Sequence, residues 1–318
     1  MPFQVSPGVN VTEVDLTTVI PAVSTSVGAA VGSFIWGPAE QAVLVGSEDE
    51  LVANFGKPNT NTAVDFFSAA NFLAYSNAMR VVRVANTGGT FNARDSAVGS
   101  AIQINNDEIW DGLESADRAN TFYAKYPGEL GNSLTVEWCD GGDDIGAANG
   151  FSAFTSSSLF SAPPGTSPYV TARGGANDEI HVVVKDDGLG TIAGQPSGVL
   201  EYWGFLSKAE DALSDSGDVN YYIDVINNES NYIRVGADLS ILDGLNTGGQ
   251  STQSFGFSSG STGNGFGAST LSGGVSGSSG SGAYGADDYI RGWDLPVSYT
   301  HLRAHETSLP IVCRLLLE

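Results

Sequence analysis

Apolar residues between positions 27 and 84 fall into three short runs and two helical stripes. The runs Val27–Trp36, Ala42–Val45 and Met79–Val84 are rich in small or β-branched residues, and this pattern predicts three strands. Gly37 and Pro38 end the first run with a turn signal. Two helices are expected between the second strand and the third.

The first of these helices is predicted from its ends. Ser47 and Glu50 have the spacing of a capping box, in which side chains bond backbone N–H groups at the helix start. The helix therefore begins at Glu48. It is expected to end near Phe55, because the following Gly56 adopts left-handed conformations readily.

The second helix is predicted from an apolar stripe that begins after Thr62 and stops near Asn77. The members of the stripe recur at helical spacing: Phe66, Ala69, Ala70, Leu73 and Ala74. The order strand, strand, helix, helix, strand predicts a mixed sheet with helices laid on it. Residues 27–85 are thus expected to form one α/β core unit.

Residues 86–245 predict a β-rich middle region. Strands are expected at Thr121–Tyr126, Leu134–Cys139 and Ile180–Lys185, and a surface loop is expected over residues 141–167. One helix is predicted near residues 199–213, because apolar positions there approximate helical spacing: Leu200, Phe205 or Leu206, Ala209 and Leu213.

The composition changes again after residue 245. Residues 246–286 contain no charged residue and are dominated by glycine and serine, which predicts a flexible loop. Residues 287–295 are expected to return the chain to the core unit. Residues 296–318 share no composition with the rest and are interpreted as a non-native tail outside the fold. The predicted fold class is α+β: an incomplete mixed-sheet α/β core unit with an inserted β-rich domain and an extended N-terminal arm.

Residues 1–26 are that arm. Prolines punctuate alternating apolar positions, and the segment carries too little apolar surface for a core of its own. Extended segments of this kind dock by adding a strand to another sheet. The candidate residues of this intersubunit arm are Val9, Val11 and Val14, of which Val9 and Val11 share a face under strict alternation. A frayed terminus is the alternative interpretation.

The charge of the chain excludes several classes of partner. Its 36 acidic and 13 basic residues give a net charge of −23, which provides no electrostatic attraction to phosphate backbones or anionic lipid. No apolar run reaches the ~20 residues that a membrane span requires. Neither nucleic-acid binding nor membrane insertion is therefore expected. Cys139 and Cys313 form no disulfide framework, and a reducing compartment is the expectation.

Candidate chemical sites are few and weak. His181 lies alone in an apolar run, where a solvent-facing or hydrogen-bonded histidine is expected in place of a metal ligand, and Cys139 is expected to be a buried, inert thiol. Two groups of aspartates lack the register of a calcium loop: Asp140 with Asp143 and Asp144, and Asp186 with Asp187. No nucleophile elbow or phosphate-binding loop occurs. We expect neither an enzyme nor a metal or cofactor site.

A set of segments along the chain is distinctive in its order and spacing. They are SPGVNVTEVD (6–15), FIWGPA (34–39), LVANFGKP (51–58), NFLAYSNAMRVVRV (71–84), AKYPGELGNSLTV (124–136), VLEYWGFLSKAEDA (199–212), NYYIDVINNESNYIRV (220–235), TLSGGVSG (270–277) and YIRGWDL (289–295). Together they resemble the N-terminal portion of contractile bacteriophage (myovirus-type) tail sheath proteins.

This resemblance implies a structural subunit that polymerises around a tail tube and contracts to drive the tube through the host envelope. The implied partners are other sheath subunits in a helical homopolymer, the tail tube protein, and the baseplate and tail terminator proteins. The implied location is the virion, after assembly in the host cytoplasm. In that family the N-terminal arm joins the sheet of a neighbouring subunit, which agrees with a docking role for residues 1–26.

Two alternatives stay open at this point. One is the sheath of a phage-derived contractile injection or secretion system. The other, from a different class, is an acidic secreted adhesin or surface-layer module, although no export signal or calcium register is visible. The segment VSYTHLRAHETSLPIVCRLLLE at residues 297–318 resembles the translation of sequencing-adapter DNA. The native gene is therefore expected to continue past Leu295, and the chain to be a truncated sheath protein.

Overall fold

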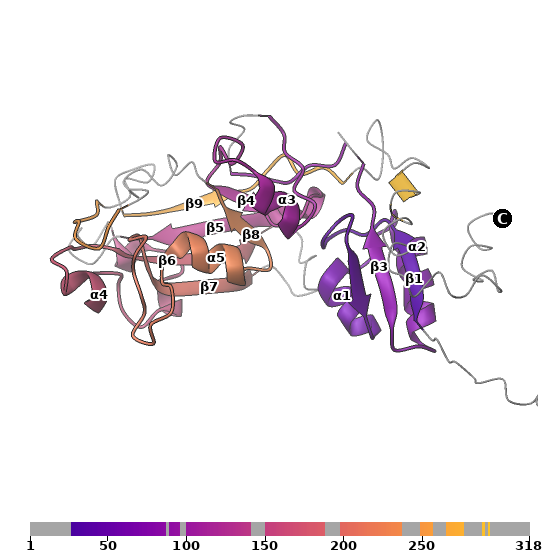
Figure 1. The fold of residues 1–318 in the computed structure, drawn as a ribbon, viewed down its shortest axis with the longest axis horizontal. Helices are drawn as coiled ribbons and strands as arrows, with labels where there is room; N and C mark the ends of the chain where they lie inside the picture. The colour runs from indigo at the N-terminus through magenta and orange to yellow at the C-terminus, as the bar shows by residue number, and fades with distance from the viewer. Residues whose placement is uncertain are drawn as a thin grey trace, which may run out of the picture.

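The structure is a computed structural model, and it describes residues 27–86, 89–95, 100–140, 150–187, 198–236, 249–256, 265–276, 288–289 and 292. These residues form two regions that lie side by side along the long axis of the molecule (Figure 1). We call residues 27–86 the first unit. The described residues between 89 and 276 are the β-rich region.

The first unit is a three-stranded sheet with two helices. Its elements are β1 (Gly28–Gly32), β2 (Ala42–Val45), α1 (Glu48–Phe55), α2 (Ala63–Leu73) and β3 (Met79–Arg83). The central strand β3 runs parallel to β1 and antiparallel to β2. The mixed sheet and the order of elements predicted from the sequence are confirmed. Helix α2 is shorter than predicted, because it ends at Leu73 and not near Asn77.

Local side-chain chemistry explains the start of α1. The Ser47 hydroxyl accepts a hydrogen bond from the Glu50 N–H at 3.2 Å, as the capping box predicts. The Glu50 carboxylate accepts in return from the N–H of Gly46 at 2.7 Å, one residue before the usual partner. At the other end, Gly56 has a φ of 76°, a left-handed conformation that glycine adopts without strain.

Both helices pack on one face of this sheet. Asp65 fixes α2 to the chain that follows β1, because its Oδ2 accepts from the backbone N–H and the hydroxyl of Ser33 at 2.7 and 2.8 Å. The apolar core between helices and sheet consists of Phe34, Val45, Leu51, Phe55, Phe66, Ala69, Ala70, Leu73, Met79 and Val81. Tyr289 packs on the opposite face against Val31, Val82 and Val84. It belongs to the segment that was expected to return to the core unit.

The β-rich region contains a four-stranded antiparallel sheet in the order β7-β6-β5-β9 and a separate antiparallel pair, β4 with β8. Its helices and strands are α3 (Asp107–Gly112), β4 (Phe122–Ala124), η2 (Glu129–Ser133), β5 (Leu134–Cys139), η4 (Phe151–Ala153), η5 (Ser157–Leu159), α4 (Pro168–Thr171), β6 (Glu179–Asp186), β7 (Gly198–Ser207), α5 (Tyr222–Glu229), β8 (Ile233–Val235) and β9 (Phe266–Thr270). The three strands predicted for this region are confirmed, with β5 at its predicted bounds.

The helix predicted near residues 199–213 is wrong. The segment forms the strand β7, whose pairing with β6 shifts register between Ile180 and Val182 and again between Val184 and Lys185. Each irregularity breaks the strict alternation of inward and outward residues that identifies a strand. As a result, the apolar residues of this segment recur at a spacing that resembles that of a helix. A helix does occur shortly after this strand, at α5.

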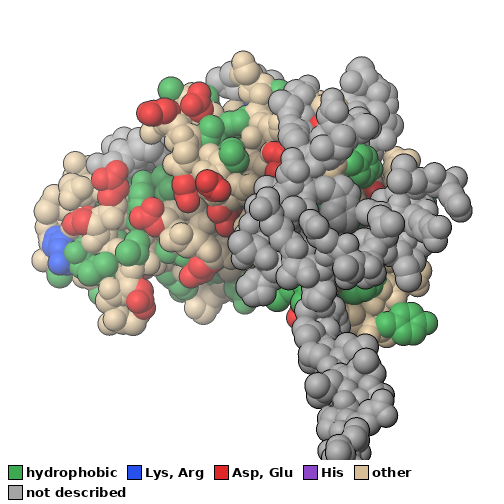
Figure 2. Space-filling view, turned by 45° about the vertical axis from the view of Figure 1, so that its right-hand side comes forward, with side chains coloured by type: hydrophobic (Ala, Val, Ile, Leu, Met, Phe, Trp, Pro, Cys, Tyr) green, Lys and Arg blue, Asp and Glu red, His purple; other side chains and the backbone are tan. Residues whose placement is uncertain are grey.

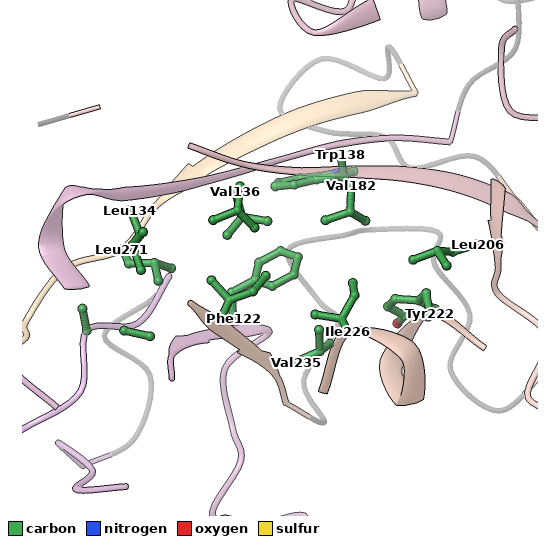
Figure 3. Close-up of a cluster of buried hydrophobic side chains, with 14 of the residues drawn as sticks. Phe122, Leu134, Val136, Trp138, Val182, Leu206, Tyr222, Ile226, Val235 and Leu271 are labelled. Atoms are coloured by element: carbon green, nitrogen blue, oxygen red, sulfur yellow. The ribbon is translucent and has the colours of Figure 1, made fainter. Parts of the chain in front are cut away.

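One face of the four-stranded sheet packs on α5 and on the β4–β8 pair. In Figure 3, Trp138 and Val182 point from the sheet toward Phe122 and Ile226 on the opposite layer. All four side chains are at most 2% exposed. Burial of this size stabilises the region by about 1.5–3 kcal/mol for each large apolar side chain.

The other face of this sheet is covered by residues 150–162, which include η4 and η5. Phe154 packs there against Cys139 and Val183. These residues lie in the segment predicted as a surface loop, and that prediction is wrong for them. The glycine- and serine-rich stretch likewise contains a strand, β9, whose pairing with β5 joins residues 135 positions apart at Thr135 and Thr270.

Candidate assembly surfaces

The three arm residues predicted from the sequence, Val9, Val11 and Val14, lie outside the described residues. The surfaces that could receive such an arm lie within the described residues of the first unit. They are the two outer strands of its sheet and the outward face of α2.

Both edges of the three-stranded sheet are open. The outer strands β1 and β2 each pair with β3 alone, and within the described part of the chain no strand pairs with their outer edges. Natural sheets protect exposed edges with charged residues or proline. The sequences of β1 (GAAVG) and β2 (AVLV) contain neither. Leu44 of β2 is 60% exposed, so this edge also offers an apolar side chain.

The outward face of α2 is uncharged and exposes large apolar side chains beside the polar Ser68 and Asn71. Val64, Phe67 and Tyr75 are 71%, 53% and 95% exposed, although they are large hydrophobic residues. Val64 and Phe67 are one helical turn apart, and Tyr75 follows the end of the helix. No charged residue occurs between Asp65 and Arg80 in the sequence. This face contrasts with the β-rich region, whose visible surface in Figure 2 carries acidic side chains throughout and basic ones in one place.

Arg83 joins the first unit to the β-rich region. Its side chain is fully buried at the end of β3. The guanidinium donates to the carbonyls of Phe34, Gly37 and Pro127 at 2.9, 2.7 and 2.6 Å. Two of these acceptors lie in the first unit and the third lies in the β-rich region, so one side chain fixes both. The sequence indicated β3 but not this role, and the only signal was a charged residue at the end of an apolar strand.

Trp36 reinforces the same joint. Its ring leaves the first unit and packs edge-on against Tyr126, with ring centroids 5.5 Å apart, and at 6.2 Å from Tyr232. Ile35 and Trp36 are members of the main core of the β-rich region. The two regions therefore share apolar core as well as hydrogen bonds.

The candidate chemical residues are engaged in structural contacts. Asp140 forms a salt bridge with Lys208 at 3.2 Å in which both side chains are fully buried. Burial lowers the pKa of Lys208, and the carboxylate of Asp140 opposes that shift. Cys139 is a buried thiol, as predicted. The described residues contain no group of three potential metal-ligating side chains. No described helix has the length and apolar character to span a membrane.

His181 is buried and hydrogen-bonded, one of the two states expected from the sequence. Its Nδ1 accepts from the N–H of Phe205 at 3.1 Å, and its Nε2 lies 3.0 Å from the carbonyl oxygen of Ala162. Burial lowers the pKa of the ring below its usual value. Both nitrogens are engaged within the fold, so neither is presented to a metal or a substrate.

Comparison with known proteins places these surfaces in context. Residues 25–84 match a family described as the tail sheath protein Gp18 domain III N-terminal region. The chain is 32% identical over 247 residues to the tail sheath protein of Salmonella phage ViI, across 76% of this chain and 35% of that protein. It is 43% identical over 88 residues to the tail sheath protein of Vibrio phage KVP40, across 28% of this chain and 13% of that protein.

Among solved structures, the sheath tail protein Lin1278 from Listeria innocua aligns with 86% of this chain and 38% of its own length, at 13% identity and a TM-score of 0.40. The chain thus spans 35% or less of the length of these two phage relatives. The resemblance identified from the sequence is confirmed: this chain is similar to the tail sheath proteins of bacteriophages.

Proposed function

We propose that this chain is a structural subunit of a contractile phage tail sheath, which polymerises around the tail tube and contracts to drive the tube through the host envelope. The observation that carries the proposal is the 32% identity to a phage tail sheath protein over 247 residues. The proposed partners are other copies of the subunit, the tail tube protein, and the baseplate and tail terminator proteins. Assembly takes place in the host cytoplasm, before release of the virion.

The first unit supplies surfaces suited to such a polymer. Copies with a net charge of −23 repel one another, so close contact is favoured where a surface carries no charge. The open edges of β1 and β2 meet that condition. A strand added there forms backbone hydrogen bonds without bringing acidic side chains together.

In this proposal, Val9, Val11 and Val14 belong to an arm that adds a strand to the sheet of a neighbouring copy. Backbone hydrogen bonds hold such a strand, and the side chains on one of its faces determine whether it can bind to the sheet edge. The exposed Leu44 on the edge strand β2 is the apolar contact available to that face.

The function is tested by locating the protein in virions that carry its gene. Antibodies raised against this chain, with gold labels, are expected to decorate intact phage tails along their length in electron micrographs. Labels on contractile particles without capsids would favour a phage-derived injection system. Labels on the host cell surface would overturn the sheath proposal in favour of an adhesin.

The arm is tested by comparing Val11→Pro with Val11→Ala in sedimentation experiments on the parent protein. Proline removes a backbone donor as well as apolar area, so Val11→Pro is expected to reduce self-association more than Val11→Ala. Equal association of the parent and both variants would show that residues 1–26 are not an intersubunit arm.

A further inference from the structure

His181 lies opposite an irregularity in the strand pairing of β6 and β7. The register passes from Ile180 with Leu206 to Val182 with Trp203. Gly204 and Phe205 therefore both face the single residue His181, which is the arrangement of a β-bulge. A bulge leaves backbone groups without their ladder partners. Here the imidazole takes the place of one missing partner.

Phe205 is held in an unusual conformation at this bulge. Its φ is 59°, in the left-handed region that bulky residues rarely occupy. Its N–H donates to His181 Nδ1 at 3.1 Å, and its ring meets the imidazole edge-on with centroids 4.7 Å apart. The hydrogen bond to His181 thus stabilises a backbone conformation that is unfavourable by itself.

The same imidazole holds residues 150–162 against the outer face of the sheet. Because Nδ1 accepts from an N–H, the proton of the neutral ring is on Nε2, which donates to the Ala162 carbonyl at 3.0 Å. Phe160 stacks on the imidazole with centroids 4.1 Å apart and planes 10° from parallel. Phe151 meets it edge-on at 5.9 Å. A Cβ at Gly204 would lie 3.0 Å from the Phe160 ring, a tight contact, so the glycine favours this stacking.

Among the described residues, no charged side chain pairs with the His181 imidazole. Residues 150–162 contain no acidic or basic residue. The charged side chains on the neighbouring strands have partners of their own. They are Glu137 with Lys185 and with Ser156 of residues 150–162, Asp140 with Lys208, Glu179 with the Gly165 N–H, Asp178 with Ser167 and Ser207, and Glu201 with Ser230 and Asn231. If Nδ1 carried a proton, it would be a second donor facing the Phe205 N–H. The two donors would lie among the side chains of Phe151, Phe160 and Phe205.

We propose that His181 is an acid-released latch, whose protonation at Nδ1 breaks the bond to Phe205 and frees residues 150–162 from the sheet. Release uncovers the apolar surface of the sheet on which Phe154 packs, made by Cys139, Val183 and Phe266. The folded protein favours the neutral ring, because burial lowers the pKa of His181. The contribution of this latch to the free energy of unfolding is therefore complete above pH 6.5, the pKa of the histidine in the unfolded chain. It decreases as the pH falls below that value.

The buried thiol of Cys139 reports the opening directly. In a Cys313→Ser background, the labelling rate is measured with a dithiodipyridine reagent, which reacts at acidic pH, and is normalised to the unfolded protein. We expect labelling to be about tenfold faster near pH 5 than near pH 7.5, because protonation of His181 should shift the equilibrium between the closed and released forms about tenfold. A flat pH profile would overturn the proposal.

The matched variant is His181→Asn, whose amide oxygen replaces the Nδ1 acceptor and does not titrate in this range. We expect faster labelling at neutral pH, because the Ala162 contact is lost, and no further rise on acidification. The same rise as in the parent would show that another group is responsible. Hydrogen exchange of α2 is the second readout. Loss of its protection at the same pH as residues 150–162 would indicate global acid unfolding and contradict a local latch.

Discussion

The two regions of the molecule differ in where they place charged side chains. In the first unit, β1 and β2 are uncharged and no described strand pairs with their outer edges, and α2 exposes Phe67 and Tyr75. The β-rich region instead carries acidic side chains over its visible surface (Figure 2) and buries some charged side chains in pairs, although its sheet also ends in strands, β7 and β9, that each pair with one neighbour. The salt bridge of Lys208 with Asp140 is the most deeply buried of these pairs. The comparison indicates that the uncharged surfaces of the first unit are the ones suited to contact between acidic copies of the chain.

The largest effect is expected where the β-rich region depends on a buried charge. Lys208→Met leaves the Asp140 carboxylate without its cation and should lower the free energy of unfolding by about 3–5 kcal/mol. Hydrogen exchange should show the loss in β5 and β6 and not in α2. The double variant Asp140→Leu with Lys208→Met is the control and should recover most of the loss. Equal losses in the single and double variants would contradict a dependence on charge pairing.

A second effect is expected at the joint between the regions. Arg83→Met removes donors from three carbonyls, those of Phe34, Gly37 and Pro127, and should cost about 3 kcal/mol. We expect calorimetry to show one unfolding transition in the parent and two in this variant. Arg83→Lys retains the charge with fewer directed donors and should lie between them. A single transition at the parent temperature in Arg83→Met would show that the joint does not couple the regions.

A smaller effect is expected within the first unit. Ser47→Ala removes the hydroxyl that caps α1 and should cost about 1 kcal/mol. The change should appear as faster hydrogen exchange in α1, with β5 and β6 unaffected. Ser47→Asp keeps a capping oxygen and should exchange like the parent. Comparable exchange in all three proteins would show that the cap contributes nothing to this helix.

The smallest effect on stability is expected from the open face of α2. Phe67→Ser combined with Tyr75→Ser should change the free energy of unfolding by no more than about 0.5 kcal/mol, since both side chains are exposed. Sedimentation should nevertheless show weaker self-association at high protein concentration. Phe66→Ser is the matched control, because Phe66 is 2% exposed and its loss should cost several kcal/mol. Unchanged association in the double variant would remove α2 from the proposed contacts.

The first unit could be predicted from the sequence because its signals are local. The Ser47 cap, the stop at Gly56 and the apolar stripe of α2 each lie within a few residues of the element that they define. The sequence also indicated the mixed sheet, since three strands with two helices between the second and third leave few arrangements. What it did not indicate was that the outer edges of this sheet are open, because edge position depends on pairing.

The β-rich region was harder to predict because its determinants are distant in sequence. Strand β9 lies in a stretch of glycine and serine and becomes a strand by pairing with β5. Two register shifts in β7 concealed its period. The role of Arg83 could not be inferred either, since its acceptor Pro127 is 44 residues away along the chain. The candidate arm residues Val9, Val11 and Val14 stay a prediction.

The parallel pairing of β1 with β3 also determines how the first unit carries mechanical load. The chain enters at Gly28, opposite the start of β3, and leaves at Arg83, opposite the end of β1. Tension between residues 27 and 83 therefore pulls the two strands past each other along their length. The five residue pairs of this ladder share that shear and do not open one at a time. Because Arg83 also bonds the Pro127 carbonyl, tension that reaches the end of β3 is passed on to the β-rich region.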